Sequence, residues 1–448
     1  MAPTPDSRAE VIVLGGPVVT CAAPGDGPAT AEAVAIGGGR ILAVGDTDEV
    51  LGRRDRHTSI VDLAGRALLP GLIEPHSHPD LCALLYDWID VSGFTHRRVR
   101  EVERALADAV AVARPGEWLF AFGLDPMLTA DLGTWDRDRL DALAPDNPLV
   151  VMLQSMHTVF VNSAALAAIG LDDDAPDPCP GFTHDGRGRR TGRVVEQPAI
   201  LLFSAHALAD PDELVRRLVD QEARYAAVGI TSVGLAGTQL GDTMLDVLAG
   251  LARRDGAAVR LVAYLRHQQA DRLARPETGD DRWRVAGVKL WYDGSPYSGT
   301  MLLDEPYLDT ELCCCTLGIP AGSVGEANFE PDELLEMLTA FAADGWQVLT
   351  HAQGDRGVRE IVDLYRDALD AAGRRGADHR WRLEHCLLAS PADLERSLEL
   401  GVSPSFHVDH VRWYGRHLRD EILGPDRCAH LMPVGTAHRL GHRVSLHA

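Results

Sequence analysis

The second half of the chain alternates predicted helices with short apolar strands, and this alternation restricts the fold more than any other feature. Most neighbouring strands are separated by a helical stretch, which is the pattern of parallel β/α units. The strand-like runs after residue 211 cover residues 229–234, 259–265, 287–295, 346–355, 381–386, 401–410 and 441–448. With the run at 71–76 there are eight strands, the number found in a (β/α)8 barrel.

We therefore expect an α/β fold: a (β/α)8 TIM barrel with an inserted α/β lobe and part of a small N-terminal β-sandwich, with the chain stopping at the eighth strand. The N-terminal part alternates short β runs with glycine turns, and the glycines at 37–39 indicate a hairpin. The predicted domains are a partial β-sandwich module at 1–68, the barrel at 69–86 and 226–448, and the lobe at 87–225.

Composition excludes several classes of protein. The 448 residues are 46% hydrophobic and 24% charged, as in an ordinary globular protein, and the formal charge is −23. That charge argues against nucleic acid or an anionic membrane surface as the main partner. The first residues do not have the pattern of a signal peptide, and no apolar run has the roughly 20 residues of a membrane span. We therefore expect a cytoplasmic protein, and eight cysteines without a Cys-x-x-Cys pair indicate free thiols.

Polar residues stand at the ends of four predicted strands. They are His76, His78, Lys289, Asp293, His351 and His385. A His-x-His pair alone is more often two ordinary histidines, and a lone histidine at a strand end is usually packed or capped. Active sites of barrels lie at the carboxyl ends of the strands, and four histidines from three strands at that face indicate a transition-metal site.

Lys289 does not fit a simple set of metal ligands, because an ammonium group donates hydrogen bonds and has no lone pair. A lysine among histidines could react with carbon dioxide to give an anionic carbamate, which ligates like a carboxylate and can bridge two metals. The structural alternative is a lysine that neutralises Asp293 or Asp304. The alternation in GVKLWYD places Lys289 and Asp293 on the inward face, with Val288 and Leu290 toward the helices.

Several motifs resemble those of a known family, in the family's order and over nearly the whole chain. They are LLPGLIEPHSH, HTVFVNSAAL, TGRVVE, GVKLWYDGS, GWQVLTHAQGDRGV, RLEHC and GHRVSLHA. Together they resemble the amidohydrolase superfamily, in its YtcJ-like, N-substituted formamide deformylase-like branch. The resemblance implies a TIM barrel with a metal-dependent hydrolytic site and a divalent metal, zinc by preference, as one or two ions.

The resemblance also implies roles for residues. By motif position, His76, His78, His351 and His385 match the family's metal histidines, and Lys289 matches its carboxylated lysine. The implied reaction is hydrolysis of an amide or formamide-type C–N bond by a metal-activated water.

His157, Asp293 and Arg356 could contact the substrate, although each could equally be structural, and Arg356 is better explained by a turn or by pairing with Asp355. One departure leaves the catalytic residue unknown. The family's eighth strand ends in an aspartate, which would come after Ala448.

Three hypotheses follow for function. The first is a metal-dependent amidohydrolase acting on a small N-acyl or N-formyl compound. The second is a deaminase of a cyclic amidine. The third, which the missing aspartate supports, is a truncated, inactive metal-binding fragment. The expected partner is a small-molecule substrate, without nucleic acid or membrane, and a homodimer is left open.

Overall fold

The computed structural model describes residues 8–447, apart from 23–26, 197, 209–210, 239–240, 273–275 and 277. The chain forms two compact units, Met1–Leu72 and Ile73–Ala448, and each is described by itself. Among the described residues, no helix is long and apolar enough to cross a membrane. The eight cysteines are free thiols, as predicted.

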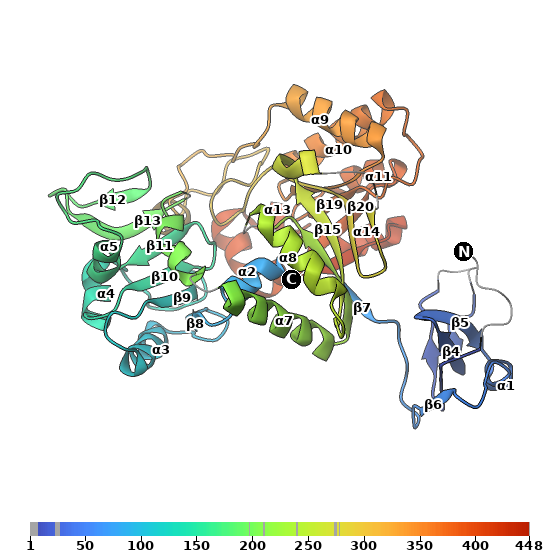
Figure 1. The fold of residues 1–448 in the computed structure, drawn as a ribbon. Coiled ribbons are helices and arrows are strands. Elements are labelled where there is room, and N and C mark those ends of the chain that lie inside the picture. Colours follow the sequence, from blue (N-terminus) through green and yellow to red (C-terminus); the bar gives the residue numbers. More distant parts are fainter. Residues whose placement is uncertain are drawn as a thin grey trace. The chain divides into compact units, whose positions relative to one another are not determined.

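The first unit is built around a four-stranded sheet in the order β5-β4-β1-β6 (Figure 1). Its elements are β1 (Val11–Leu14), β2 (Val18–Val19), β3 (Thr30–Ala31), β4 (Ala33–Gly37), β5 (Arg40–Gly45), α1 (Thr47–Leu51) and β6 (Ser59–Asp62). Gly38 and Gly39 have φ of +58° and +70° and join β4 to antiparallel β5. Two positive φ values in a two-residue turn suit glycine, and the predicted hairpin is confirmed.

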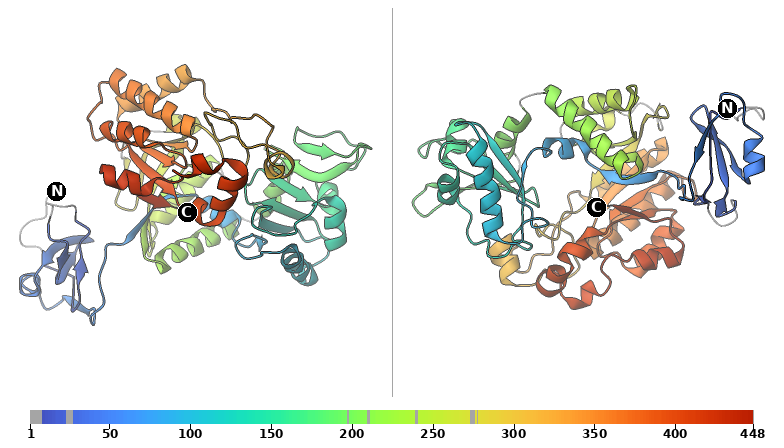
Figure 2. Two further views of the ribbon diagram at one scale, coloured as in Figure 1. Left: turned by 180° about the vertical axis from the view of Figure 1, so that it is seen from behind. Right: turned by 90° about the horizontal axis from the view of Figure 1, so that it is seen from below.

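The second unit contains the barrel. Its strands are β7 (Leu72–Ser77), β14 (Ile230–Ala236), β15 (Arg260–Arg266), β17 (Trp283–Trp291), β18 (Gln347–Ala352), β19 (Arg382–His385), β20 (Ser403–His407) and β21 (Ser445–His447). These eight strands, counted in the described part of the chain, lie side by side in sequence order. The pairs from β14 to β21 are parallel. The predicted (β/α)8 barrel is therefore confirmed, and the structure shows it nearly closed (Figures 1 and 2).

Helices surround the barrel strands (Figure 2). They are α2 (Pro79–Leu84), α7 (Pro211–Ala227), α8 (Asp242–Arg253), α9 (Pro331–Asp344), α10 (Asp355–Ala371), α11 (Pro391–Glu399), α13 (Pro425–Cys428) and α14 (Val434–Leu440). Helix α10 buries Val358, Ile361 and Tyr365 in the same apolar cluster as Val288 and Leu290 of β17. The side of β17 that carries Val288 and Leu290 thus faces the helices, as the sequence pattern predicted.

Shorter elements lie in the connections between the barrel strands and helices. They are η2 (His267–Arg272), β16 (Thr278–Gly279), η3 (Leu312–Leu317), η4 (His410–Tyr414), α12 (Gly415–His417) and η5 (Leu418–Ile422). Strand β17 begins four residues before its predicted start, because β16 pairs with its first half as an antiparallel partner. Segments η3, η4 and η5 are π-helical.

A lobe is inserted between β7 and β14. It carries a six-stranded sheet in the order β12-β13-β11-β10-β9-β8 (Figure 1, teal to green). Its elements are β8 (Ile89–Asp90), α3 (Val99–Val112), β9 (Leu119–Leu124), α4 (Arg137–Leu143), β10 (Leu149–Leu153), β11 (Thr158–Val161), α5 (Ser163–Ala168), β12 (Phe182–His184), β13 (Arg190–Val195), α6 (Leu201–Ser204) and η1 (Ala205–Leu208). The predicted boundaries of barrel and lobe stay a prediction.

Candidate active site

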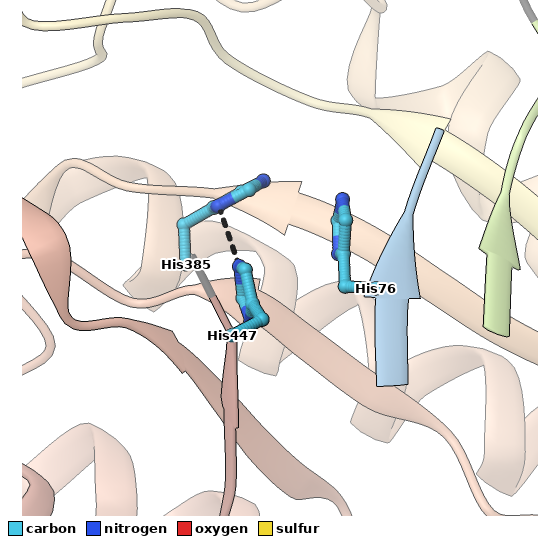
Figure 3. Close-up of side chains that lie close together, drawn as sticks. All are labelled: His76, His385 and His447. Atoms are coloured by element: carbon cyan, nitrogen blue, oxygen red, sulfur yellow. Dashed lines mark hydrogen bonds between the residues drawn. The ribbon is translucent and has the colours of Figure 1, made fainter. Parts of the chain in front are cut away.

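Three histidines from three barrel strands converge (Figure 3). His76 ends the apolar run of β7, and His385 and His447 end β19 and β21. One potential ligand nitrogen from each lies within 4.8 Å of the others, and all three side chains are buried. The rings of His76 and His447 stack with centroids 4.5 Å apart, and Nδ1 of His385 lies 3.1 Å from Nε2 of His447.

Hydrogen bonds fix which ring nitrogen of His76 and His78 is free. Nδ1 of His76 lies 2.5 Å from Oε2 of Glu384, and Nδ1 of His78 lies 3.0 Å from the carbonyl oxygen of Gly237. A carboxylate and a carbonyl oxygen only accept, so in both rings Nδ1 carries the proton. Nε2 of each ring is then left with its lone pair, which is the form that binds a metal.

Glu384 is fully buried beside the histidines. Its other oxygen accepts a 2.7 Å hydrogen bond from Nε of Arg382, whose Nη2 donates to the carbonyl oxygen of Pro75. The carboxylate is therefore held from both sides, by the imidazole of His76 and by a guanidinium. This arrangement fixes the ring of His76 in one orientation.

The backbone at His385 departs from a regular strand. Successive side chains of a strand face opposite sides, yet Glu384 hydrogen-bonds to His76 while the ring of His385 lies 4.8 Å from the same imidazole. The φ of His385 is +75°, a left-handed conformation that turns the chain. Such a conformation costs about 1–3 kcal/mol in a residue other than glycine. Two consecutive side chains thereby reach one partner.

His351, from β18, lies beside this cluster, with its ring centroid 4.3 Å from that of His385. Its Nε2 lies 3.2 Å from the carbonyl oxygen of Gly294, which leaves Nδ1 as its free nitrogen. Burial, followed by the nearby charge of Lys289, lowers the pKa of His351 to about 3. Burial also lowers the pKa of His447 to about 2. Both imidazoles are therefore neutral at neutral pH.

Lys289 is fully buried on β17, and its Nζ has no hydrogen-bond partner among the described residues. The amine lies 5.0 Å from the centre of the Trp291 ring. Burial lowers the pKa of Lys289 to about 7, although Glu384 opposes the shift. The carboxylates proposed as structural partners are engaged elsewhere: Asp304 pairs with Arg359, and Asp293 accepts backbone N–H groups.

This donor set fits a divalent transition metal. Neutral imidazoles are ligands that zinc prefers, and His76, His78, His351 and His385 each keep one ring nitrogen outside the hydrogen bonds given above. Both ring nitrogens of His447 have partners, Ser405 and His385, so a metal would take the place of one of these contacts. The residues that could hold the ion are His76, His78, His351, His385 and His447. The amine of Lys289 is also buried inside the barrel without a hydrogen-bond partner among the described residues. Buried polar groups normally have a partner, so a bound ligand is expected to supply one here.

The three residues predicted to contact substrate lie in different places. Asp293 is buried, with Oδ1 3.7 Å from Nε2 of His351. His157 lies on the lobe and pairs with Glu196 at 3.0 Å. Arg356, at the start of α10, pairs through Nε with Glu360 at 2.8 Å. Their roles in substrate binding stay predictions.

Four residues at the strand ends were not among the predicted site residues: Glu384, His407, His410 and His447. His447 was visible as a histidine at the end of the eighth strand, and His407 as one at the end of the seventh. No signal in the sequence indicated Glu384, because strict strand alternation turns it away from His385. His410 begins a π-helical turn, which apolar periodicity does not reveal.

The sequence and the fold of this chain are similar to those of known proteins. The model of the amidohydrolase family matches residues 59–448. The N-substituted formamide deformylase of Arthrobacter pascens is 28% identical over 395 residues, which are 83% of this chain and 68% of that protein. The protein named "Putative amidohydrolase YtcJ" of Bacillus subtilis (strain 168) is 25% identical over 434 residues, which are 92% of this chain and 75% of that protein. The crystal structure of an uncharacterized metal-dependent hydrolase from Pyrococcus furiosus is similar in fold, with a TM-score of 0.71 at 23% identity over 98% of this chain and 85% of that one.

Proposed function

This chain belongs to the amidohydrolase family, in its YtcJ-like branch, and from that membership we propose that it hydrolyses a C–N bond of a small molecule with a divalent metal held by the histidine cluster. The observation that carries the proposal is the convergence of His76, His385 and His447, whose potential ligand nitrogens lie within 4.8 Å of one another. A metal bound there supplies Lewis acidity, which polarises a carbonyl oxygen and lowers the pKa of water.

The chain's own residues prepare the site for such an ion. Glu384 and the carbonyl oxygen of Gly237 hold the Nδ1 protons of His76 and His78, so that the Nε2 lone pairs would be available to an ion. Burial keeps His351 and His447 neutral, with pKa values of about 3 and about 2. No proton has to leave these imidazoles before a metal binds at neutral pH.

Lys289 is proposed to act as a carbamate. With a pKa of about 7, a large share of its amine is neutral at neutral pH and can attack the carbon of carbon dioxide. The nitrogen then loses a proton and becomes part of an anionic carbamate. The carbamate nitrogen keeps a single N–H, so fewer donors would be buried without a partner within the described chain than in the free amine.

The substrate class we favour is an N-substituted formamide or a related small amide. The support is the name of the Arthrobacter pascens relative, which is 28% identical to this chain. We propose zinc as the metal, because imidazole nitrogens with one anionic ligand suit it.

The test compares the zinc-loaded protein with the double variant His76→Ala/His78→Ala on N-substituted formamides, simple N-acyl amines and cyclic amidines. We expect amine and formate release by the wild type, and loss of both zinc and turnover in the variant. The matched control is a double variant of two exposed histidines, His430→Ala/His438→Ala. This control should keep both its zinc and its turnover. Turnover of cyclic amidines alone, or unchanged zinc content in the His76/His78 variant, would contradict the proposal.

A further inference from the structure

A buried pair of side chains lies next to the histidine cluster without belonging to the proposed metal site. Oη of Tyr297, in the loop after β17, lies 2.6 Å from Nδ1 of His410, the first residue of η4. His410 is only 6% exposed, and its other nitrogen, Nε2, has no partner among the described residues. A buried polar atom without a partner is costly, so this nitrogen is expected to meet a ligand.

The ring of His410 lies close to the proposed metal ligands. It is 4.3 Å from the ring of His407, which lies 5.3 Å and 5.7 Å from the rings of His447 and His385. His410 is thus one imidazole away from the metal site. It also begins a π-helical turn, a conformation that occurs frequently at functional sites.

The phenol of Tyr297 is hydrogen-bonded to Nδ1 of His410, so the direction of this bond sets which nitrogen of the ring carries the proton. Burial raises the pKa of Tyr297, so its hydroxyl stays protonated. Its hydrogen bond to His410 is the one side-chain bond of this hydroxyl seen in the described chain. If the hydroxyl donates to Nδ1, the proton of a neutral His410 is on Nε2. Burial, His407 and His351 lower the pKa of His410, which keeps this ring neutral.

The inserted lobe holds this pair in place. The ring of Tyr297 packs against that of Tyr414 at 4.6 Å, and the hydroxyl of Tyr414 donates a 2.7 Å hydrogen bond to Oδ2 of Asp125. Asp125 belongs to the lobe, follows β9, and is 2% exposed. Tyr297 and His410 therefore have little freedom to move, which is a condition for electrostatic catalysis.

We propose that His410 is a catalytic residue whose Nε2–H donates a hydrogen bond to the substrate oxygen on which negative charge develops, and that Tyr297 is a positioning residue that holds it in this tautomer. The inference rests on the proposed function. A neutral imidazole can act as such a donor. The loss of one such donor costs about 10²- to 10³-fold in kcat.

The experiment uses zinc-loaded protein and four variants. His410→Phe removes the donor, His410→Gln keeps an N–H donor of similar reach, and Tyr297→Phe removes the hydroxyl. His430→Phe is the matched control, because His430 is exposed. Zinc content should be equal in all of them. With a formamide that the wild type hydrolyses, His410→Phe should lower kcat by about 10²- to 10³-fold with little change in KM. His410→Gln should recover part of this loss.

Two further measurements do not depend on turnover. Methylphosphonate, a tetrahedral anion, should bind zinc-loaded His410→Phe about 10- to 100-fold more weakly than the wild type in titration calorimetry, while His430→Phe binds normally. Nitrogen-15 spectra should show one Nε2–H tautomer of His410 in the wild type and a mixture in Tyr297→Phe.

Equal methylphosphonate binding by wild type and His410→Phe, or no binding by the wild type, would overturn the inference even if the protein hydrolyses formamides. So would a higher KM at unchanged kcat, or loss of zinc from His410→Phe. Failure of the wild type to hydrolyse any C–N substrate, with methylphosphonate binding as expected, would overturn the proposed function and leave the donor role of His410 supported.

Discussion

His76 and Glu384 stand 308 residues apart in the sequence and share a 2.5 Å hydrogen bond between Nδ1 and Oε2. The bond joins the first barrel strand to the sixth, at the cluster where His385 and His447 also end their strands. Arg382 donates a hydrogen bond to the other oxygen of the same carboxylate, so both oxygens of the fully buried Glu384 have partners. The ring of His76 is thereby oriented before any metal arrives.

The first prediction concerns this carboxylate. Glu384→Gln removes the anionic acceptor of the His76 proton and leaves the guanidinium of Arg382 without its charged partner. We expect zinc affinity to fall about 10- to 100-fold, the usual effect of losing an outer partner of a metal-binding histidine. Competition with a chelator measures this affinity. Glu395→Gln, an exposed substitution on α11, is the control, and equal affinity of both variants would contradict the role of Glu384.

The second prediction is a pH dependence of stability caused by Lys289. Its folded-state pKa of about 7 lies below the ordinary value of 10.5. Between these two values the unfolded state holds a proton that the folded state lacks, so stability rises with pH. From pH 7.5 to 8.5 the metal-free protein should gain about 1 kcal/mol.

Lys289→Met provides the comparison, because it keeps the apolar stem and removes the titrating group. Chemical unfolding at the two pH values, in buffer free of carbon dioxide, measures the difference between the proteins. If both gained the same stability, the amine of Lys289 would not be held neutral by the fold.

The sequence was informative where a polar residue interrupts an apolar run. His76, His351 and His385 are the last or next-to-last residues of their strands, and the eight strands were located to within a few residues because apolar runs alternate with amphipathic helices. Lys289 was predicted to face inward because its neighbours Val288 and Leu290 are apolar, and both lie in the helix-facing core. The alternation of side chains along a strand, together with the position of each strand in the barrel, was enough to predict where these residues lie.

The remaining features depend on backbone geometry that side-chain patterns do not contain. The positive φ of His385 lets Glu384 and His385 approach the same histidine, against the alternation of a regular strand. The π-helical turn that begins at His410 has no apolar repeat of its own. The pairing of Tyr297 with His410 joins the loop after β17 to the start of η4, 113 residues further along the chain. Such contacts follow from how the nearly closed barrel brings distant parts of the chain together, and they could not be predicted from local sequence.

The third prediction concerns His447, which was outside the predicted ligand set. Its ring stacks on that of His76, and its Nε2 lies 3.1 Å from Nδ1 of His385. Ser405 holds its Nδ1 at 2.9 Å. We expect His447→Ala to weaken zinc binding by at least about 10-fold, measured by chelator competition. His438→Ala, an exposed substitution on α14, should bind zinc as the wild type does, and normal affinity of His447→Ala would exclude it from the site.

The last prediction concerns the stability of the lobe and Asn162. This fully buried side chain makes four hydrogen bonds: Oδ1 accepts from the N–H groups of Leu149 and Ala165, and Nδ2 donates to the carbonyl oxygens of Ala144 and Asn147. It caps α5 and ties it to β10 and to the end of α4.

Asn162→Ala would remove a helix cap worth about 1 kcal/mol and leave three buried backbone groups without these partners. We expect a loss of about 3–4 kcal/mol in the free energy of unfolding, measured by chemical denaturation. Asn328→Ala is the control, since that exposed side chain makes one hydrogen bond, to the carbonyl oxygen of Trp291. Because Asp125 of the lobe holds Tyr414, which packs on Tyr297, the nitrogen-15 signals of His410 should also broaden in Asn162→Ala. A destabilisation below about 1 kcal/mol would show that water or neighbouring groups replace the four bonds, and that the lobe does not depend on this side chain.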